Sequence, residues 1–284
     1  MNREKLKVII PFLSSKYKFR PAIIEKDFYI TIILNDINSI LSDKIVFKGG
    51  TLLNKIYFNY NRLSEDIDFT FCQNTKLESR SERSRSIEPI KNKMPDFLDK
   101  LNLKSSNPNG DGFNESQQYV FNIIYPSIVT GRDENIKIDI SLRQSPVNAA
   151  VQNPVKHFFK DPFTAEDLLP TNKIICLSLK EAVAEKLKAA ISRRDFAIRD
   201  FYDLWYISES KFDFNNPDFI KIFRKKLEEE GFNNNFKYNL GLSKRSIENL
   251  TNQVESMLIP VIKADEKFDL EKVLNRFNKL LSNF

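Results

Sequence analysis

Two hydrophobic periods divide this chain, one typical of strands and one typical of helices. Alternating or short apolar runs predict strands over residues 44–48, 66–71, 117–125 and 135–142. Apolar residues spaced three to four apart predict a long helix over 21–41, which has proline in its first turn, and another over 87–101. The first half of the chain therefore combines strands with helices.

The second half reads differently. From about residue 164 onward the apolar spacing is almost wholly helical, with helices expected over 179–208, 217–230, 243–257 and 270–281. We therefore predict an α/β (α+β) fold in two parts. A lobe with a mixed sheet occupies residues 1–163, and a mostly helical lobe over residues 164–284 closes the active-site cleft.

Two carboxylates share one face of the predicted strand 66–71. At two residues per repeat, Asp66 and Asp68 point the same way, with Cα atoms roughly 6.5 to 7 Å apart. Flexible carboxylates at that separation can share one Mg²⁺ or hold two ions, and they repel each other when no cation lies between them. The alternative is that the pair is only the solvated face of an edge strand.

A glycine pair precedes these acids. Gly49 and Gly50 join the predicted strand 44–48 to a short predicted helix over 51–60. Backbone N–H groups at a helix N-terminus attract phosphate, and glycine lets a ligand approach them closely. The alternative is a tight turn without a ligand. The carboxylate pair that follows favours a site for a nucleoside triphosphate and its metal ions.

A third carboxylate occurs in the predicted strand 135–142. There Lys137, Asp139 and Ser141 lie on the face opposite to three isoleucines. Asp139 can complete a metal-binding triad with Asp66 and Asp68 from a neighbouring strand. Taken alone, Asp139 would be an ordinary exposed strand residue.

Composition narrows the chemistry. The chain has 284 residues, of which 41% are hydrophobic, so it can bury a large core. It has one histidine, His157, and two cysteines, Cys72 and Cys176. This composition argues against a zinc cage, a histidine-based catalytic triad and a disulfide framework. The chemistry must therefore use carboxylates, lysines, arginines and a bound metal.

Charge favours an anionic partner only mildly, because the net charge of +6 comes from 44 basic and 38 acidic side chains. Two local clusters are candidates for RNA contact. The first is the set of arginines 80, 83 and 85 in the polar run 73–86, for which the alternative is a mobile loop. The second is the aromatic and basic segment 156–160, for which the alternative is a hydrophobic plug. The chain has no long apolar run, and its first residues are too charged for a secretory signal. We expect no membrane association and a cytoplasmic location.

Five segments carry a resemblance to a known family: Ile24-Glu25-Lys26-Asp27-Phe28-Tyr29, Val46-Phe47-Lys48-Gly49-Gly50-Thr51-Leu52, Leu63-Ser64-Glu65-Asp66-Ile67-Asp68-Phe69, Ala184-Glu185-Lys186-Leu187-Lys188-Ala189 and Arg199-Asp200-Phe201-Tyr202-Asp203-Leu204. In this order they resemble the AbiEii nucleotidyltransferase toxins of bacterial abortive-infection systems, which belong to the DNA polymerase β nucleotidyltransferase superfamily. The resemblance covers about residues 20 to 210. It implies a polymerase-β-like nucleotidyltransferase lobe at the N-terminal end.

The resemblance also implies site residues. Gly49 and Gly50 would form the phosphate turn together with Lys48 and Thr51, Asp66 and Asp68 would hold the metal, and Asp139 would be the later acid. Lys186 would neutralise triphosphate charge, and Asp200 or Asp203 would hold Lys186 or the acceptor. For Asp203, the alternative is a salt bridge with Arg199 on one face of a helix.

The activity implied by the resemblance is transfer of a nucleotide from a nucleoside triphosphate to RNA, with Mg²⁺ or Mn²⁺ as cofactor and tRNA as the expected acceptor. A cognate antitoxin would relieve the resulting growth arrest in a phage-defence system, and the two proteins need not form a stable complex. Two alternatives stay open. One is a nucleotidyltransferase that modifies a small molecule or a protein hydroxyl. The other is a non-catalytic nucleotide-binding module.

Overall fold

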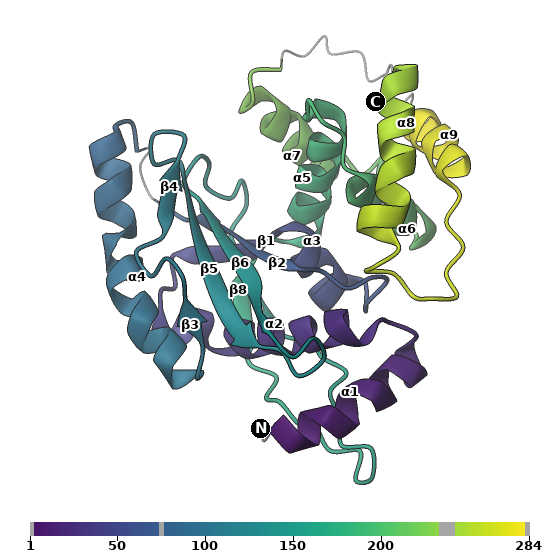
Figure 1. Cartoon of the computed structure of the whole chain (residues 1–284). Helices are drawn as coiled ribbons and strands as arrows, with labels where there is room; N and C mark the ends of the chain where they lie inside the picture. Colours follow the sequence, from purple (N-terminus) through teal and green to yellow (C-terminus); the bar gives the residue numbers. More distant parts are fainter. Residues whose placement is uncertain (1–2, 74–76, 233–241, 282–284) are drawn as a thin grey trace.

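A mixed sheet lies at the centre of the N-terminal part of the chain (Figure 1). The computed structural model describes residues 3–73, 77–232 and 242–281, and within these residues the sheet has eight strands in the order β3-β5-β6-β2-β1-β8-β7, with β4 paired to β5. The strands are β1 Ile45–Lys48, β2 Asp66–Phe71, β3 Lys104–Ser105, β4 Asp111–Phe113, β5 Gln118–Pro126, β6 Asp133–Ser141, β7 Val151–Pro154 and β8 Lys173–Cys176.

Strand β2 is central, antiparallel to β1 and parallel to β6. The register places Lys48 opposite Asp68 on one side and Asp139 opposite Asp68 on the other. Ile67 and Phe69 are fully buried, whereas Asp66 is exposed at the start of the strand. The predicted alternation of β2 is therefore confirmed, and its polar face carries a row of charged residues across three strands.

The helices surround the sheet unevenly. In Figure 1, α4 lies beside β3 to β5, α1 and α2 lie below the sheet, and α5 to α9 gather at the upper right. No helix in the described ranges is long and apolar enough to span a bilayer. The bounds are α1 Arg3–Tyr17, α2 Pro21–Ile40, α3 Gly49–Leu52, the π-helical turn η1 Leu53–Tyr57, α4 Arg80–Lys100, α5 Leu179–Ser192, α6 Ile198–Glu209, α7 Pro217–Glu228, α8 Lys244–Gln253, η2 Val254–Leu258 and α9 Leu270–Leu281.

Helix α2 confirms the predicted long helix and shows how polar residues enter the core. Pro21 occupies the first turn, where its missing N–H leaves no bond unmade. Glu25 is fully buried and accepts hydrogen bonds from Ser127 Oγ at 2.5 Å and from the Ile128 N–H at 2.7 Å, in the loop between β5 and β6. Asp27 pairs with the buried Lys55 at 2.8 Å. Glu25 thus holds the β5–β6 loop against α2, and Asp27 holds η1 through Lys55.

Helix α4 begins earlier than the sequence pattern predicts. A capping box formed by Ser79 and Glu82 starts it at residue 80 rather than near residue 87. Arg83 is buried and donates to the carbonyl groups of Leu77, Glu78 and Glu115. The expected polar loop 73–86 is therefore wrong from residue 80 onward, and Arg83 anchors the fold instead of contacting RNA. Residues 74–76 lie outside the described part of the chain.

The aromatic segment 156–160 follows its alternative interpretation as a hydrophobic plug. Phe158 and Phe159 are buried. Lys156 donates to the carbonyl of Ile56 at 2.6 Å, and Lys160 pairs with Asp167 at 2.7 Å. The segment therefore packs into the core, and its lysines bond to the protein's own groups.

Strand β8 is the main departure from the expected helical second half. It follows residue 164, and it pairs with β1 in parallel at Phe47 and Cys176 and with β7 in antiparallel orientation. Its four residues are too few for periodicity to distinguish a strand from a helix. The division at residue 163 stays a prediction. Because β8 belongs to the sheet, we propose that the first lobe extends to Cys176. The later helices fall in the predicted ranges, but the range 179–208 holds two helices, α5 and α6, separated at residues 193–197, and the range 243–257 holds α8 followed by η2.

Candidate active site

A cavity of about 610 Å³ opens between the sheet and the helical part of the chain. The predicted site residues that line it come from the β1–α3 turn, β2, α5 and α6: Lys48, Gly49, Gly50, Asp66, Asp68, Lys186 and Asp200. Thr51, Asp139 and Asp203, all of them described in the structure, are not among the lining residues. The glycine turn and both strand carboxylates therefore open onto the same space, as the sequence pattern predicts.

The surroundings of the two strand carboxylates disfavour their ionised forms. The pKa of Asp68 is raised from its ordinary value of 3.8 to about 6, with burial as the largest cause; the charge of Lys48 lowers this pKa, and the charges of Asp139 and Asp66 raise it. Burial also raises the pKa of Asp66. Desolvated like charges of this kind are relieved when a cation binds between them. The electrostatics of the cavity floor therefore favour a metal ion.

Glycine is required at the β1–α3 turn because of what lies against it. Gly49 has a φ of +78°, and a Cβ at this position would lie 2.2 Å from Asp68 Oδ2. A Cβ on Gly50 would lie 2.6 Å from Arg62 Nη2. The turn is thus more than a tight connection, because the absence of side chains lets its backbone approach a candidate metal ligand and a buried arginine.

Thr51 occupies a different position from the one expected. It is buried, and its hydroxyl donates to the backbone carbonyl of Asp66. The hydroxyl is therefore committed to β2, outside the cavity, and is not placed to contact phosphate. It fastens α3 to the strand that carries the carboxylates.

Asp139 likewise differs from the expected metal triad. Its Oδ2 accepts a hydrogen bond from Gln118 Nε2 and lies 3.1 Å from Lys137 Nζ. Among the described residues, no group of three or more His, Cys, Asp or Glu side chains has an arrangement that could hold a metal ion. The triad of Asp66, Asp68 and Asp139 is not assembled, and Asp139 acts on the site through the charge that it places beside Asp68.

The predicted catalytic residues of α5 and α6 form one ionic network. Lys186 Nζ lies 2.8 Å from Asp200 Oδ1 and 3.0 Å from Asp203 Oδ2. Arg62 donates to both carboxylate oxygens of Asp203, at 2.7 and 2.8 Å. Although burial acts to raise it, the charges of Arg62 and Lys186 hold the pKa of Asp203 below its ordinary value. Asp203 is therefore an internal anchor, whereas Asp200 reaches the cavity edge.

Arg199 does not pair with Asp203 as the helical spacing allowed. It forms an ion pair with Glu65, and Arg62 takes its place beside Asp203. Sequence reasoning missed Arg62 because it lies in the irregular segment between η1 and β2, where no hydrophobic period indicates which way a side chain points.

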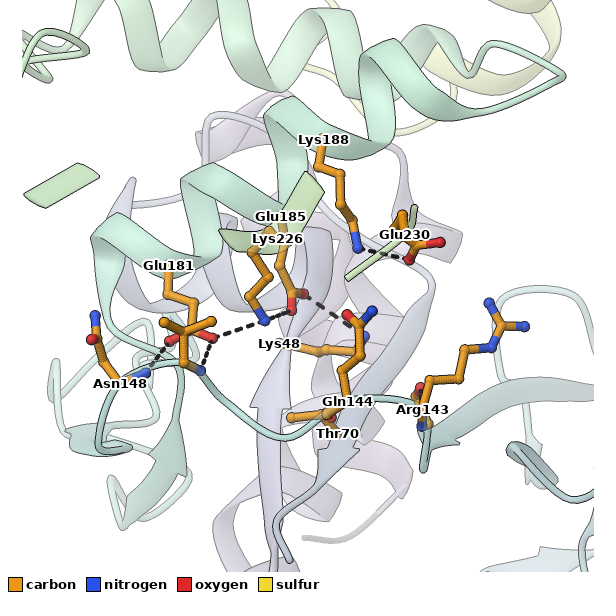
Figure 2. Close-up of polar contacts among 12 residues, drawn as sticks. Lys48, Thr70, Arg143, Gln144, Asn148, Glu181, Glu185, Lys188, Lys226 and Glu230 are labelled. Atoms are coloured by element: carbon orange, nitrogen blue, oxygen red, sulfur yellow. Dashed lines mark hydrogen bonds and ion pairs between the residues drawn. The ribbon is translucent and has the colours of Figure 1, made fainter. Parts of the chain in front are cut away.

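Further cations line the cavity and were not singled out from the sequence. Arg143 follows β6, Lys188 lies on α5 and Arg193 follows α5 directly. Lys188 pairs with Glu230 at 3.0 Å, and Arg193 pairs with Asp200 at 2.9 Å. Figure 2 shows Arg143 in the segment after β6 and Lys188 on α5, directed toward Glu230. Basic side chains from the sheet and from the helices thus converge on the carboxylates, which suits an anionic ligand.

Comparison with known protein families agrees with this geometry. A family model described as the nucleotidyl transferase AbiEii toxin of the Type IV toxin–antitoxin system matches residues 32–282. The chain belongs to the AbiEii family. This AbiEii-family protein is therefore a toxin nucleotidyltransferase, which confirms the predicted family and enzyme class and argues against a non-catalytic module.

Solved structures show the same fold. The AbiEii-family chain is similar to MenT4, a nucleotidyltransferase toxin from Mycobacterium tuberculosis H37Rv, with a TM-score of 0.58 and 11% identity over 100% of this chain and 99% of that one. JHP933 from Helicobacter pylori gives a TM-score of 0.51 and 14% identity over 93% and 92% of the two chains. No curated protein matches the sequence. At these identities the likeness shows the fold alone, and it confirms the predicted α/β class.

Proposed function

We propose that this AbiEii-family enzyme transfers a nucleotide from a nucleoside triphosphate to an RNA acceptor, with tRNA as the expected target. The observation that carries the proposal is the convergence of Asp66, Asp68 and the Gly49–Gly50 turn on one cavity. Nucleotidyl transfer needs a phosphate cradle beside carboxylates that hold metal ions, because positioning and charge neutralisation supply most of the rate.

The residues present fit a divalent metal. Mg²⁺ is commonly held by one or two carboxylates together with water and substrate phosphates, so Asp66 and Asp68 suffice without a third acid. Burial raises the pKa of both carboxylates, although Asp66 is exposed at the start of β2, and the two share one face of that strand. Bound there, Mg²⁺ or Mn²⁺ would neutralise phosphate charge and favour displacement at phosphorus.

The chain's own groups supply the remaining parts. The backbone at Gly49 and Gly50 admits phosphate oxygens closely, since no side chain blocks the approach. One of the two carboxylates, Asp66 or Asp68, would orient the attacking hydroxyl. Lys48 and Lys186 line the same cavity and add positive charge where the triphosphate would lie.

The basic rim supports an RNA acceptor. Arg143, Arg193 and Arg199 line the cavity from separate segments, and guanidinium groups bind phosphate in a forked geometry. The Type IV family assignment supports growth arrest relieved by a cognate antitoxin, without the need for a stable complex. NTP and tRNA as substrates would place the action in the cytoplasm, and phage defence is the proposed context.

The test is incorporation of label into RNA. Each labelled triphosphate is incubated with total RNA and Mg²⁺ and either wild-type protein, Asp66→Asn or Asp68→Asn, and the RNA 3′ ends are then sequenced. We expect both variants to lose at least about a hundredfold in incorporation, because each removes a carboxylate charge that would hold the metal ion needed for nucleotidyl transfer. The exposed Asp96 on α4 provides the control variant Asp96→Asn.

Undiminished incorporation by both variants would reject the proposed site. Pyrophosphate release without label in RNA would instead favour a small-molecule or protein hydroxyl as acceptor. Toxicity in cells should follow incorporation, so Asp66→Asn and Asp68→Asn are expected to grow normally when expressed.

A further inference from the structure

Lys48 lies directly across from Asp68, yet its ammonium group turns to a different carboxylate. The antiparallel register pairs Lys48 with Asp68, and directly opposed residues of opposite charge on one face ordinarily interact. These two described residues form no ion pair in the structure. Lys48 Nζ instead lies 3.7 Å from Glu185 Oε2 on α5.

Glu185 is itself fixed from behind. Its second oxygen, Oε1, accepts from Lys226 Nζ on α7 at 2.9 Å, and Lys226 also lies 2.9 Å from Glu181 Oε1 (Figure 2). The side chains of Lys226 and Glu181 are each only 1% exposed. The two oxygens of Glu185 are therefore divided between a buried cation and the cavity-facing Lys48.

The cluster is also tied to the opposite wall of the cavity. Glu181 accepts from the backbone N–H groups of Val147 at 2.7 Å and Asn148 at 3.1 Å. In the same segment, Thr70 Oγ on β2 donates to the carbonyl of Gln144 at 2.5 Å, as Figure 2 shows. A buried ionic cluster whose members are all partnered resists displacement, because moving one member leaves another unpaired. Glu185 therefore cannot follow Lys48 if the ammonium moves.

The charge state of Glu185 suits this arrangement. Burial alone would raise its pKa, but the charges of Lys48 and Lys226 lower that pKa to about 2. The carboxylate is thus ionised throughout the neutral range and attracts Lys48 continuously.

We propose that Glu185, backed by Lys226, is a positioning residue that holds the Lys48 ammonium away from the Asp66–Asp68 pair. The pair then stays available for a divalent cation, and Lys48 stays at the cavity wall, where it can meet phosphate. Without the Glu185 charge, Lys48 turns to its cross-strand partner Asp68 and competes with the cation. The catalytic consequence rests on the proposed function, whereas the position of Lys48 does not.

A crystal structure of the metal-free Glu185→Gln variant tests the position directly. The glutamine amide oxygen still accepts from Lys226, so the fold is expected to survive, and a thermal melt checks this. We expect Lys48 Nζ to form an ion pair with Asp68. An ammonium group that stays beside residue 185 would overturn the proposal.

Binding of Mn²⁺ alone, followed by electron paramagnetic resonance, tests the competition. Glu185→Gln should weaken Mn²⁺ binding about tenfold in the presence of Lys48 and should have no effect in the Lys48→Met background. Equal weakening in both backgrounds would show a uniform loss of negative field and overturn the proposal. Asp218→Asn is the matched control, because Asp218 on α7 pairs at 3.0 Å with Lys180 on α5, the helix that carries Glu185, but does not line the cavity.

Dependence on Mg²⁺ separates this role from a merely structural one. Excess Mg²⁺ should restore nucleotide transfer by Glu185→Gln, whereas a damaged fold would lower the rate at every Mg²⁺ concentration. If the wild-type protein transfers no nucleotide at all, the proposed function fails, and the crystal structure of Glu185→Gln still decides where Lys48 lies.

Discussion

At the residue scale, Asp68 holds a negative charge where its surroundings oppose it. Burial is the largest cause, and the carboxylates of Asp139 and Asp66 add to it. Its partner across the sheet, Lys48, pairs with Glu185, and the charge of Lys48 lowers the pKa of Asp68 without offsetting the burial. A carboxylate in this condition reduces the stability of the metal-free fold and gains from binding a cation, which is a common conflict at functional sites.

The raised pKa of Asp68 predicts how metal binding depends on pH. Its pKa is about 6 in the fold, compared with an ordinary value of 3.8, so below about pH 6 the folded protein holds a proton that a cation must displace. We expect Mn²⁺ affinity to fall about tenfold between about pH 7 and about pH 5. Electron paramagnetic resonance titrations at the two pH values measure the change.

The same linkage gives the sign for stability. Because the folded state binds the Asp68 proton more tightly than the unfolded chain does, the destabilisation from this charge diminishes as pH falls through about 6.

For the Mn²⁺ titration, Asp68→Asn is the control, and its residual Mn²⁺ binding should no longer vary between about pH 7 and about pH 5. A variant that kept the full pH dependence would assign the titration to another group.

At the scale of elements, the strand–turn–helix unit of β1 and α3 is fastened to β2 at two points. Gly49 lies against the Asp68 carboxylate, and the Thr51 hydroxyl donates to the carbonyl of Asp66. The turn and the carboxylates therefore form one rigid unit. A change in the turn should disturb the carboxylates even though no catalytic side chain is altered.

Gly49→Ala tests this coupling. The substitution imposes a side chain on a φ of +78° and drives its Cβ to within 2.2 Å of Asp68 Oδ2, so we expect the free energy of unfolding to fall by more than about 2 kcal/mol. Gly131→Ala is the matched control, since Gly131 has a φ of +72° and nothing within 4 Å of an added Cβ. It should show only the backbone strain, about 1 to 2 kcal/mol.

Urea unfolding of both glycine variants measures the difference. Nucleotide transfer should be lost in Gly49→Ala and retained in Gly131→Ala. Equal losses of stability, with equal activities, would show that the contact with Asp68 has no consequence.

At the scale of the whole molecule, buried ion pairs join the helical part to the sheet. Arg62, which precedes β2, and Asp203 on α6 are 141 residues apart in sequence, yet their side chains are 3% and 2% exposed and form two hydrogen bonds. Lys186 on α5 completes the network. The cavity exists only when both halves are in place, so the catalytic machinery depends on this connection.

Asp203→Asn should therefore act on stability first. Removing one partner of a buried pair leaves the other charge uncompensated, and we expect the free energy of unfolding to fall by about 3 kcal/mol. Asp265→Asn, at an exposed site, should change it by less than about 0.5 kcal/mol. Chemical denaturation measures both. Wild-type stability with lost transfer in Asp203→Asn would show a direct catalytic role instead.

The sequence by itself determined the local features of the fold and site. Polar and apolar alternation placed Asp66 and Asp68 on one face of β2, and the glycine pair marked the turn before α3. The helices of the second half also lie where the apolar spacing predicts them. These features depend on neighbouring residues only, through backbone dihedral angles and side-chain periods, so they can be read without knowing the partners.

Only the tertiary structure decided which charges meet. It turned Asp203 inward to Arg62 and left Asp200 at the cavity edge. It also buried Arg83, which lies on the early-starting helix α4, and paired Glu185 with Lys48. It also added β8 to the sheet beside β1. Such pairings join residues distant in sequence, and their energies depend on burial and geometry that no local period encodes.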